Sequence, residues 1–183
     1  PVSGSEILTK LEDHLIKMRD EIGYQISMGR SFEMTLDKID VPSQKQWTPD
    51  DKAFSDQVKS VYDQLTTDPP APESSLIPHA LALIGDHYHP PFYIPPSLDP
   101  IFQKMGMPIR YIYDVTKLNE DNLKGINLLV ILRDGMIWPK SDNEMEFWLT
   151  EEQEKAIADF VANGGGFLAL HNCTALKNLD GKP

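Results

Sequence analysis

The chain has 183 residues and a mass of 20.7 kDa, which suits one domain or a small domain with an added segment. It carries 28 acidic and 17 basic residues, a net charge of −11, and this excess of carboxylates argues against nucleic-acid partners and anionic membrane surfaces. Hydrophobic residues make up 40% of the sequence, so the chain can bury a core, and no apolar run reaches the roughly 18 residues of a membrane span.

A single cysteine, Cys173, excludes an internal disulfide framework and a zinc site built mainly from thiolates. A nucleophilic role for it is weakly supported, because a lone cysteine is usually buried and inert. No signal peptide opens the sequence, and the leading Pro1 without Met indicates trimming, as in an exported protein that has lost an N-terminal segment.

The first 68 residues are predicted to form an α-helical hairpin. Apolar residues recur at spacings of three and four from Ser3 to Met28, and Ser3 with Glu6 fits a capping box. Thr48-Pro49-Asp50-Asp51 predicts the start of a second helix, with Thr48 as the N-cap. The expected apolar stripes are Leu8, Leu11, Leu15, Met18 and Ile22 in the first helix, and Phe54, Val58, Val61, Tyr62 and Leu65 in the second. We interpret this hairpin as a packing or docking segment.

Residues 69–76 are predicted to form a semi-rigid linker, because their prolines cannot continue a helix. They separate the hairpin, residues 1–68, from a domain that covers residues 77–183. In that domain four short apolar runs alternate with helical patterns, which is typical of an α/β domain with a parallel sheet. The expected strands are 80–85, 109–115, 127–132 and 167–170, and the expected helices are 97–105, 120–124 and 151–163, with Ser97 and Thr150 as N-caps and Gln153 completing a capping box.

In an open parallel sheet, ligands bind beyond the carboxyl ends of the strands. Three of the five histidines fall there, together with two aspartates, and we call this edge of the sheet the rim. The rim residues are Asp86, His87, Tyr88 and His89 after the first strand, Arg133, Asp134 and Trp138 after the third, and His171, Asn172 and Cys173 after the fourth.

These residue types suit two kinds of chemistry. His87, His89 and His171 could bind a divalent metal such as zinc, which would activate water or polarise a carbonyl. Without a metal, His171, Asp134 and Asp86 would act as acid and base on a sugar hydroxyl or on a carbon next to a carbonyl. Tyr88, Trp138 and Asn172 are then the predicted substrate contacts, since aromatic rings stack on sugar faces. The alternative is that the histidine loop serves only turn geometry.

Three stretches resemble the trehalose-utilisation (ThuA-like) domain of the class I glutamine amidotransferase-like superfamily. They are Leu83-Ile-Gly-Asp-His-Tyr-His-Pro90, the segment from Asn127 to Gly135, and the helix beginning Leu-Thr-Glu-Glu-Gln followed by Gly-Gly-Gly-Phe-Leu-Ala-Leu-His171. The resemblance covers roughly residues 77–176 and implies a flavodoxin-like sheet. Amidotransferases carry a nucleophilic cysteine at the position of His171, so glutamine hydrolysis is not implied.

The resemblance implies a carbohydrate-related function, directed at (keto-)disaccharides and with a divalent metal as the candidate cofactor. The family domain continues beyond the histidine turn, whereas this sequence ends twelve residues later, so we expect an incomplete sheet with an unpaired edge. The alternative function is therefore a non-catalytic interaction subunit, in which other protein chains cover that edge or the apolar stripe of the first helix.

Overall fold

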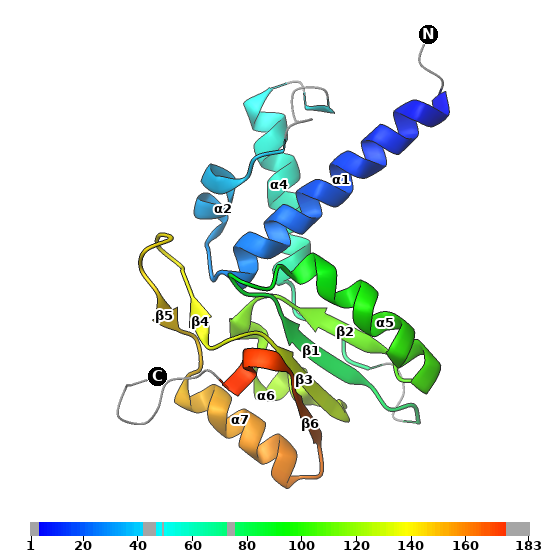
Figure 1. Ribbon diagram of the computed structural model, residues 1–183, viewed down its shortest axis with the longest axis vertical. Helices are drawn as coiled ribbons and strands as arrows, with labels where there is room; N and C mark the ends of the chain where they lie inside the picture. Colours follow the sequence, from blue (N-terminus) through cyan, green and yellow to red (C-terminus); the bar gives the residue numbers. More distant parts are fainter. Residues whose placement is uncertain (1–3, 42–46, 49, 73–75, 175–183) are drawn as a thin grey trace.

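A four-stranded parallel sheet organises the computed structural model, which describes residues 4–41, 47–48, 50–72 and 76–174 (Figure 1). Its strands are β1 (Ala80–Ile84), β2 (Ile109–Ile112), β3 (Leu128–Leu132) and β6 (Gly166–Ala169), in the order β2-β1-β3-β6. Every pair is parallel, and Leu83 of β1 lies opposite Ile112 on one side and Ile131 on the other. The predicted α/β fold with a partial, flavodoxin-like parallel sheet and a preceding helical segment is confirmed.

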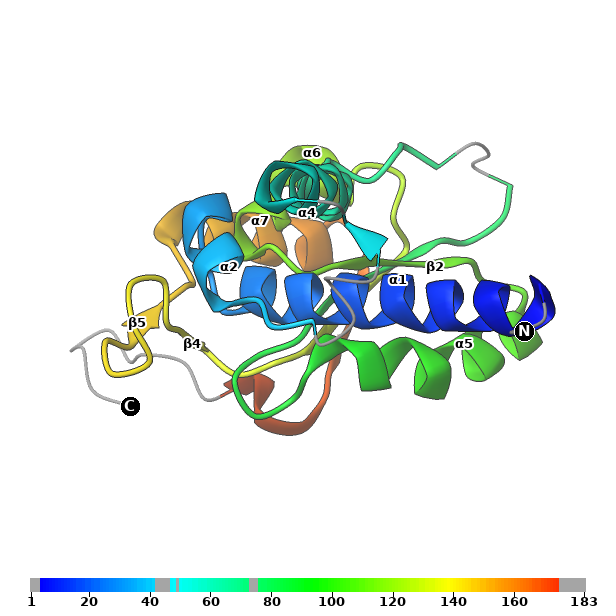
Figure 2. The ribbon, with the colours of Figure 1, turned by 90° about the horizontal axis from the view of Figure 1, so that it is seen from above.

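Helices cover both faces of the sheet (Figure 2). On one face, α5 (Ile94–Met105) packs through Ile94 and Phe102 against Ala82 of β1 and Val130 of β3. On the other face, α6 (Glu120–Leu123) and α7 (Glu151–Ala162) pack against Leu81 and Leu83 of β1 and Leu129 and Ile131 of β3. All five residues of β1 are buried because it is a central strand covered on both faces, which explains its continuous apolar run.

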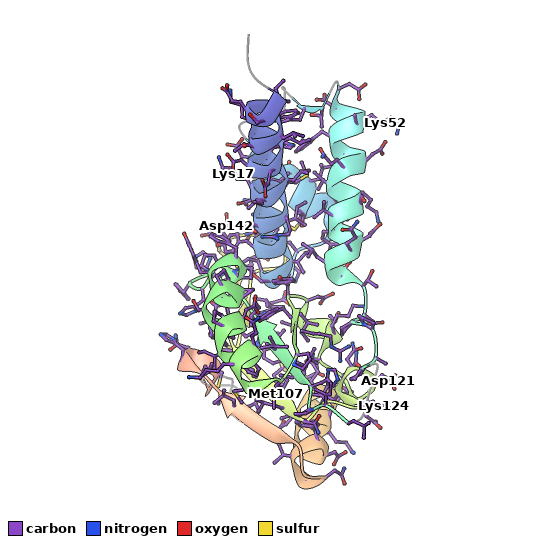
Figure 3. All side chains as sticks on the ribbon, turned by 90° about the vertical axis from the view of Figure 1, so that its right-hand side faces the viewer. Lys17, Lys52, Met107, Asp121, Lys124 and Asp142 are labelled. Carbon is purple, nitrogen blue, oxygen red and sulfur yellow. The ribbon has the colours of Figure 1, made fainter. Side chains whose placement is uncertain are left out.

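Three described helices form the N-terminal segment: α1 (Gly4–Ser27), α2 (Phe32–Lys38) and α4 (Asp51–Thr66). Figure 3 shows α1 and α4 side by side, extending away from the sheet. The predicted stripe of α1 divides into two parts. Met18 and Ile22 are fully buried against α4, whereas Leu8 is 67% exposed and Leu15 is 43% exposed. The inner half of α1 therefore belongs to a core, and its outer half presents apolar side chains to solvent.

The N-caps observed in the structure agree with the predicted ones for one helix and differ for two. Thr150 and Gln153 form the predicted capping box of α7. The N-cap of α4 is Asp50 rather than Thr48, because its carboxylate accepts a hydrogen bond from the Ala53 N–H. Helix α5 begins at Ile94 and not after Ser97, whose hydroxyl donates to the Tyr93 carbonyl. Two prolines in its first turn already have the fixed φ of a helix. Ser3, the other predicted cap, lies outside the described residues.

Several short elements were not predicted. They are α2, the antiparallel pair β4 (Met136–Ile137) and β5 (Glu146–Phe147), and the 3-10 helices η1 (Pro91–Tyr93), η2 (Val115–Lys117) and η3 (His171–Thr174). These short elements lack the continuous apolar runs that mark the equally short strands of the sheet, so their sequences carry little signal. In the part of the chain that the structure describes, no helix has the length and apolar character needed to cross a membrane.

Candidate functional site

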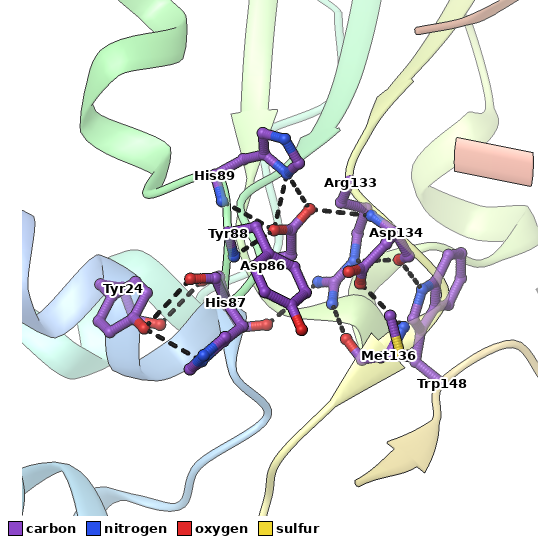
Figure 4. Close-up of polar contacts among 10 residues, drawn as sticks. Tyr24, Asp86, His87, Tyr88, His89, Arg133, Asp134, Met136 and Trp148 are labelled. Carbon is purple, nitrogen blue, oxygen red and sulfur yellow. Dashed lines mark hydrogen bonds and ion pairs between the residues drawn. The ribbon is translucent and has the colours of Figure 1, made fainter. Parts of the chain in front are cut away.

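The candidate site lies at the rim, where the loops after β1 and β3 leave neighbouring strands in opposite directions. The chain passes from β1 through α5 to the β2 side of the sheet, and from β3 through α7 to the β6 side. In open α/β sheets this switch of direction opens a crevice beyond the carboxyl ends of the strands. Asp86 follows β1 and Asp134 follows β3, so the two predicted acids flank the expected crevice (Figure 4).

Asp86 organises the rim. Its carboxylate is fully buried and accepts hydrogen bonds from the backbone N–H groups of Tyr88 (2.7 Å), His89 (2.8 Å) and Asp134 (2.9 Å). It also lies 2.8 Å from Nδ1 of His89. One carboxylate thus joins the loops after β1 and β3 and fixes the turn that carries the histidines.

The Asp86 contact sets the tautomer of His89. A carboxylate only accepts hydrogen bonds, so Nδ1 of His89 carries the proton and Nε2 is left to exchange protons with a ligand. The His89 side chain is partly exposed, and its ring meets that of His171 edge to face at a centroid distance of 4.5 Å. The predicted approach of these two histidines on one rim is confirmed.

The backbone at His171 is strained. Its φ is +55°, a left-handed value that side chains other than glycine adopt at a cost. Strand β6 ends two residues earlier and η3 begins at this residue, so the turn from strand to helix places an exposed imidazole at the rim. Strain of this kind collects at functional sites, which favours a role for His171 beyond turn geometry.

His87 lies away from the other two histidines, in an aromatic cluster. Its ring centroid is 4.8 Å from that of Trp138 and 4.9 Å from that of Tyr88. The Tyr24 hydroxyl of α1 lies 3.5 Å from both Nδ1 and the carbonyl oxygen of His87. Tyr88 is 61% exposed, whereas Trp138 is only 7% exposed. The exposed ring of Tyr88 is therefore accessible to a ligand, whereas the buried ring of Trp138 packs against His87.

Asp134 and Arg133 form the buried charges beneath the rim. One oxygen of Asp134 accepts the Met136 N–H, and the other is buried with no hydrogen-bond partner among the described residues. Burial raises the pKa of Asp134, and the neighbouring Asp86 carboxylate adds to the increase. The Arg133 guanidinium donates to the carbonyls of Asp134, Met136 and Ser27, and burial lowers its pKa to about 10.

The remaining predicted residues fall at or near the rim. Asn172 is exposed beside His171 in η3, while Cys173 is buried and burial raises the pKa of its thiol, which disfavours a thiolate nucleophile. No three or more His, Cys, Asp or Glu side chains of the described residues are grouped so as to hold a metal. Both oxygens of Asp86 are also occupied by N–H donors. The metal set of His87, His89 and His171 stays a prediction.

Sequence reasoning missed two residues of the site. Tyr24 reaches the rim from α1, some sixty residues earlier in the chain, and its position in the helical pattern carries no mark of this contact. Trp148 donates its indole N–H to the Asp134 carbonyl (2.7 Å), and its ring lies 5.5 Å from the Arg133 guanidinium. The buried end of α1 and the residue that follows β5 are therefore part of the support of the rim.

A groove of about 540 Å³ lies near the rim, between η2 and α7, and Trp148 is one of its lining residues. Its floor is apolar, with Val115 and Leu118, and Gln153 donates across it to the Val115 carbonyl. The groove holds none of the rim's imidazole and aspartate side chains, so we place the candidate chemistry at the rim, where hydrogen bonds orient the titratable groups.

Comparison of the chain with protein-family models, with curated proteins and with solved structures gave no match, so the resemblance to the ThuA-like family stays an expectation from the sequence.

Proposed function

We propose that this chain binds a carbohydrate at the rim and acts on it by general acid–base catalysis. The observation that carries the proposal is the pair of Asp86 and His89, which leaves Nε2 of His89 free beside the imidazole of His171. A buried carboxylate that orients one imidazole, with a second imidazole in contact, is suited to moving a proton between a base and an acid. The substrate class, a (keto-)disaccharide, comes from the ThuA-like resemblance.

Each residue has a defined part in this proposal. His89 takes a proton from a sugar hydroxyl or from a carbon next to a carbonyl, and the Asp86 carboxylate stabilises the imidazolium that forms. His171, whose ring contacts that of His89 edge to face, returns a proton to the product. The exposed ring of Tyr88 and the amide of Asn172 provide contacts for the sugar. Asp134 lies beneath and holds the loop after β3.

Proton exchange in D₂O tests this function. The keto derivative of trehalose is incubated with the protein, and loss of the proton next to its carbonyl is followed by NMR; trehalose itself, which has no carbonyl, is the negative control. We expect exchange with the wild type and at least about a hundredfold slower exchange with His89→Gln, since a general base contributes about 10²–10⁴-fold.

His79→Gln is the matched control, because His79 lies just before β1, at the opposite end of the strand that leads to His89. Equal exchange by the wild type and His89→Gln would contradict the assignment of the base. Absence of binding and exchange for every sugar tested would contradict the carbohydrate function itself.

A second candidate function is that of an interaction subunit. The edge strand β6 exposes Phe167 (45%) and Leu168 (38%), and its sequence from Gly166 to Ala169 holds no charge or proline that would discourage pairing with another strand. Sedimentation of the purified chain tests this function. If the chain is an interaction subunit, the sedimenting species has a mass above 20.7 kDa, and Leu168→Lys lowers that mass. A stable monomer would instead favour the catalytic function.

A further inference from the structure

The last turn of α1 lies against the two loops that flank the rim crevice. Arg133 follows β3 and donates to the carbonyl of Ser27, the final residue of α1, at 3.2 Å. The Trp138 N–H donates to the next carbonyl, that of Met28, at 2.9 Å. Helix α1 has no basic residue in its own last turn, so the buried Arg133 supplies the positive charge that a helix C-terminus favours.

The loop after β1 meets the same turn from the other side. Gly85 has a φ of +90°, and a Cβ at this position would lie 2.9 Å from Cβ of Ser27 and 2.8 Å from Cβ of Pro91. Only glycine combines this backbone conformation with such a close approach. The end of α1 is therefore fixed against both loops of the crevice, by the two hydrogen bonds to the Ser27 and Met28 carbonyls and by its close packing on Gly85.

Tyr24 lies one turn before this fixed end. Its hydroxyl lies 3.5 Å from Nδ1 and 3.5 Å from the carbonyl oxygen of His87 (Figure 4). Burial raises the pKa of Tyr24, so the hydroxyl stays protonated and can donate. Trp138 and Tyr88 pack against the ring of His87 and restrict its rotation, which leaves the Tyr24 hydroxyl as the polar group facing Nδ1.

We propose that Tyr24 is a positioning residue of the rim site: its hydroxyl holds the imidazole of His87, and helix α1 thereby forms one wall of the binding site. In the proposed arrangement the single hydroxyl proton of Tyr24 is donated to Nδ1 rather than to the equally distant carbonyl oxygen of His87, so the ring proton of His87 lies on Nε2. His87 then presents an N–H donor to an oxygen of a bound ligand. The effect on ligand binding rests on the proposed carbohydrate function, whereas the effect on His87 itself does not.

The first test uses the free protein. Side-chain ¹⁵N shifts of His87 are recorded for the wild type and for Tyr24→Phe, which removes only the hydroxyl. We expect the wild type to show His87 with its proton on Nε2, and Tyr24→Phe to show a mixture of the two tautomers. The control is Tyr62→Phe, because Tyr62 is also a half-buried tyrosine of the helical segment and donates to the Arg30 carbonyl at 2.9 Å. Unchanged His87 shifts in Tyr24→Phe, or the same change in Tyr62→Phe, would overturn the proposal.

The second test measures trehalose affinity in the same variants. One hydrogen bond contributes about 0.5–1.5 kcal/mol, so we expect Tyr24→Phe to weaken binding about 2- to 10-fold and Tyr62→Phe to leave it unchanged. In a His87→Gln background, Tyr24→Phe should have no further effect, because the hydroxyl acts through the His87 ring. Additive losses would overturn the positioning role. If the wild type binds no sugar, the proposed function fails, while the ¹⁵N shifts still decide the role of Tyr24.

Discussion

Replacing Asp86 by asparagine should destabilise the protein more than its small change in volume suggests. The carboxylate accepts three backbone N–H bonds and one from His89, all inside the protein. Asparagine keeps one oxygen, and its NH₂ group would face either the Asp134 N–H or the donors of the histidine loop. Losing a charge-assisted hydrogen bond costs about 1.5–3 kcal/mol, and leaving a buried donor unpaired costs about 1–3 kcal/mol. We therefore expect Asp86→Asn to lower the free energy of unfolding by about 3–5 kcal/mol.

Asp134→Asn is the matched control for this experiment. The oxygen that accepts the Met136 N–H is retained, and the other oxygen of Asp134 has no partner to lose among the described residues. The expected loss is below about 1 kcal/mol. Urea unfolding, followed by tryptophan fluorescence, gives both values from the midpoint and slope of the transition. Equal losses in the two variants, or a loss below about 1 kcal/mol for Asp86→Asn, would refute the central role of Asp86.

Three further predictions use the same unfolding assay. Gly85→Ala should cost about 2–4 kcal/mol because its methyl would meet Ser27, whereas Gly106→Ala, with a φ of +65° and nothing within 4 Å, should cost only about 1 kcal/mol; similar losses would contradict the close packing. Since the pKa of Asp134 is raised in the folded state, its protonated form contributes stability in acid that is lost as the pH rises from about 4 through the folded pKa. The free energy of unfolding of Asp134→Asn should therefore increase relative to that of the wild type as the pH rises through this range. A difference between the two proteins that does not change with pH would contradict this prediction. Arg133→Met should cost about 3–5 kcal/mol, because it removes the donor to the Ser27 and Met136 carbonyls and the cation near Asp86 and Asp134, and a neutral effect would contradict this structural role.

The two central strands, β1 and β3, were predictable from the sequence because they are covered on both faces of the sheet. A strand such as 80–84 must be apolar at every position, and this continuous pattern is easy to distinguish from an amphipathic helix. The capping box of Thr150 and Gln153 was predictable for a similar reason, because two residues at a fixed spacing satisfy each other's backbone groups. In both cases the interaction that creates the structure leaves a local pattern.

The site was predictable only in part. Placing Asp86, His89 and His171 together needs no more than the rule that parallel strands end on one rim. The contact of Tyr24 with His87 and that of Arg133 with Ser27 depend on where α1 packs, and packing between elements far apart in the chain leaves no local spacing to read. The exposure of Leu8 was missed for the same reason, because a helical stripe shows which face is apolar but not how far along the helix a partner extends.

The bond from Arg133 to Ser27 has a consequence for how the molecule opens. Amide hydrogens exchange with solvent when the structure around them unfolds, and groups that unfold together exchange together. Because a buried guanidinium of the sheet domain holds the end of α1, the amides of residues 22–27 can exchange only when the rim also comes apart. The outer turns of α1, from residue 5 to residue 13, lack that anchor and can fray alone. The boundary between cooperative units then runs across the middle of one helix, rather than through the proline-rich stretch that separates helices from strands in the sequence.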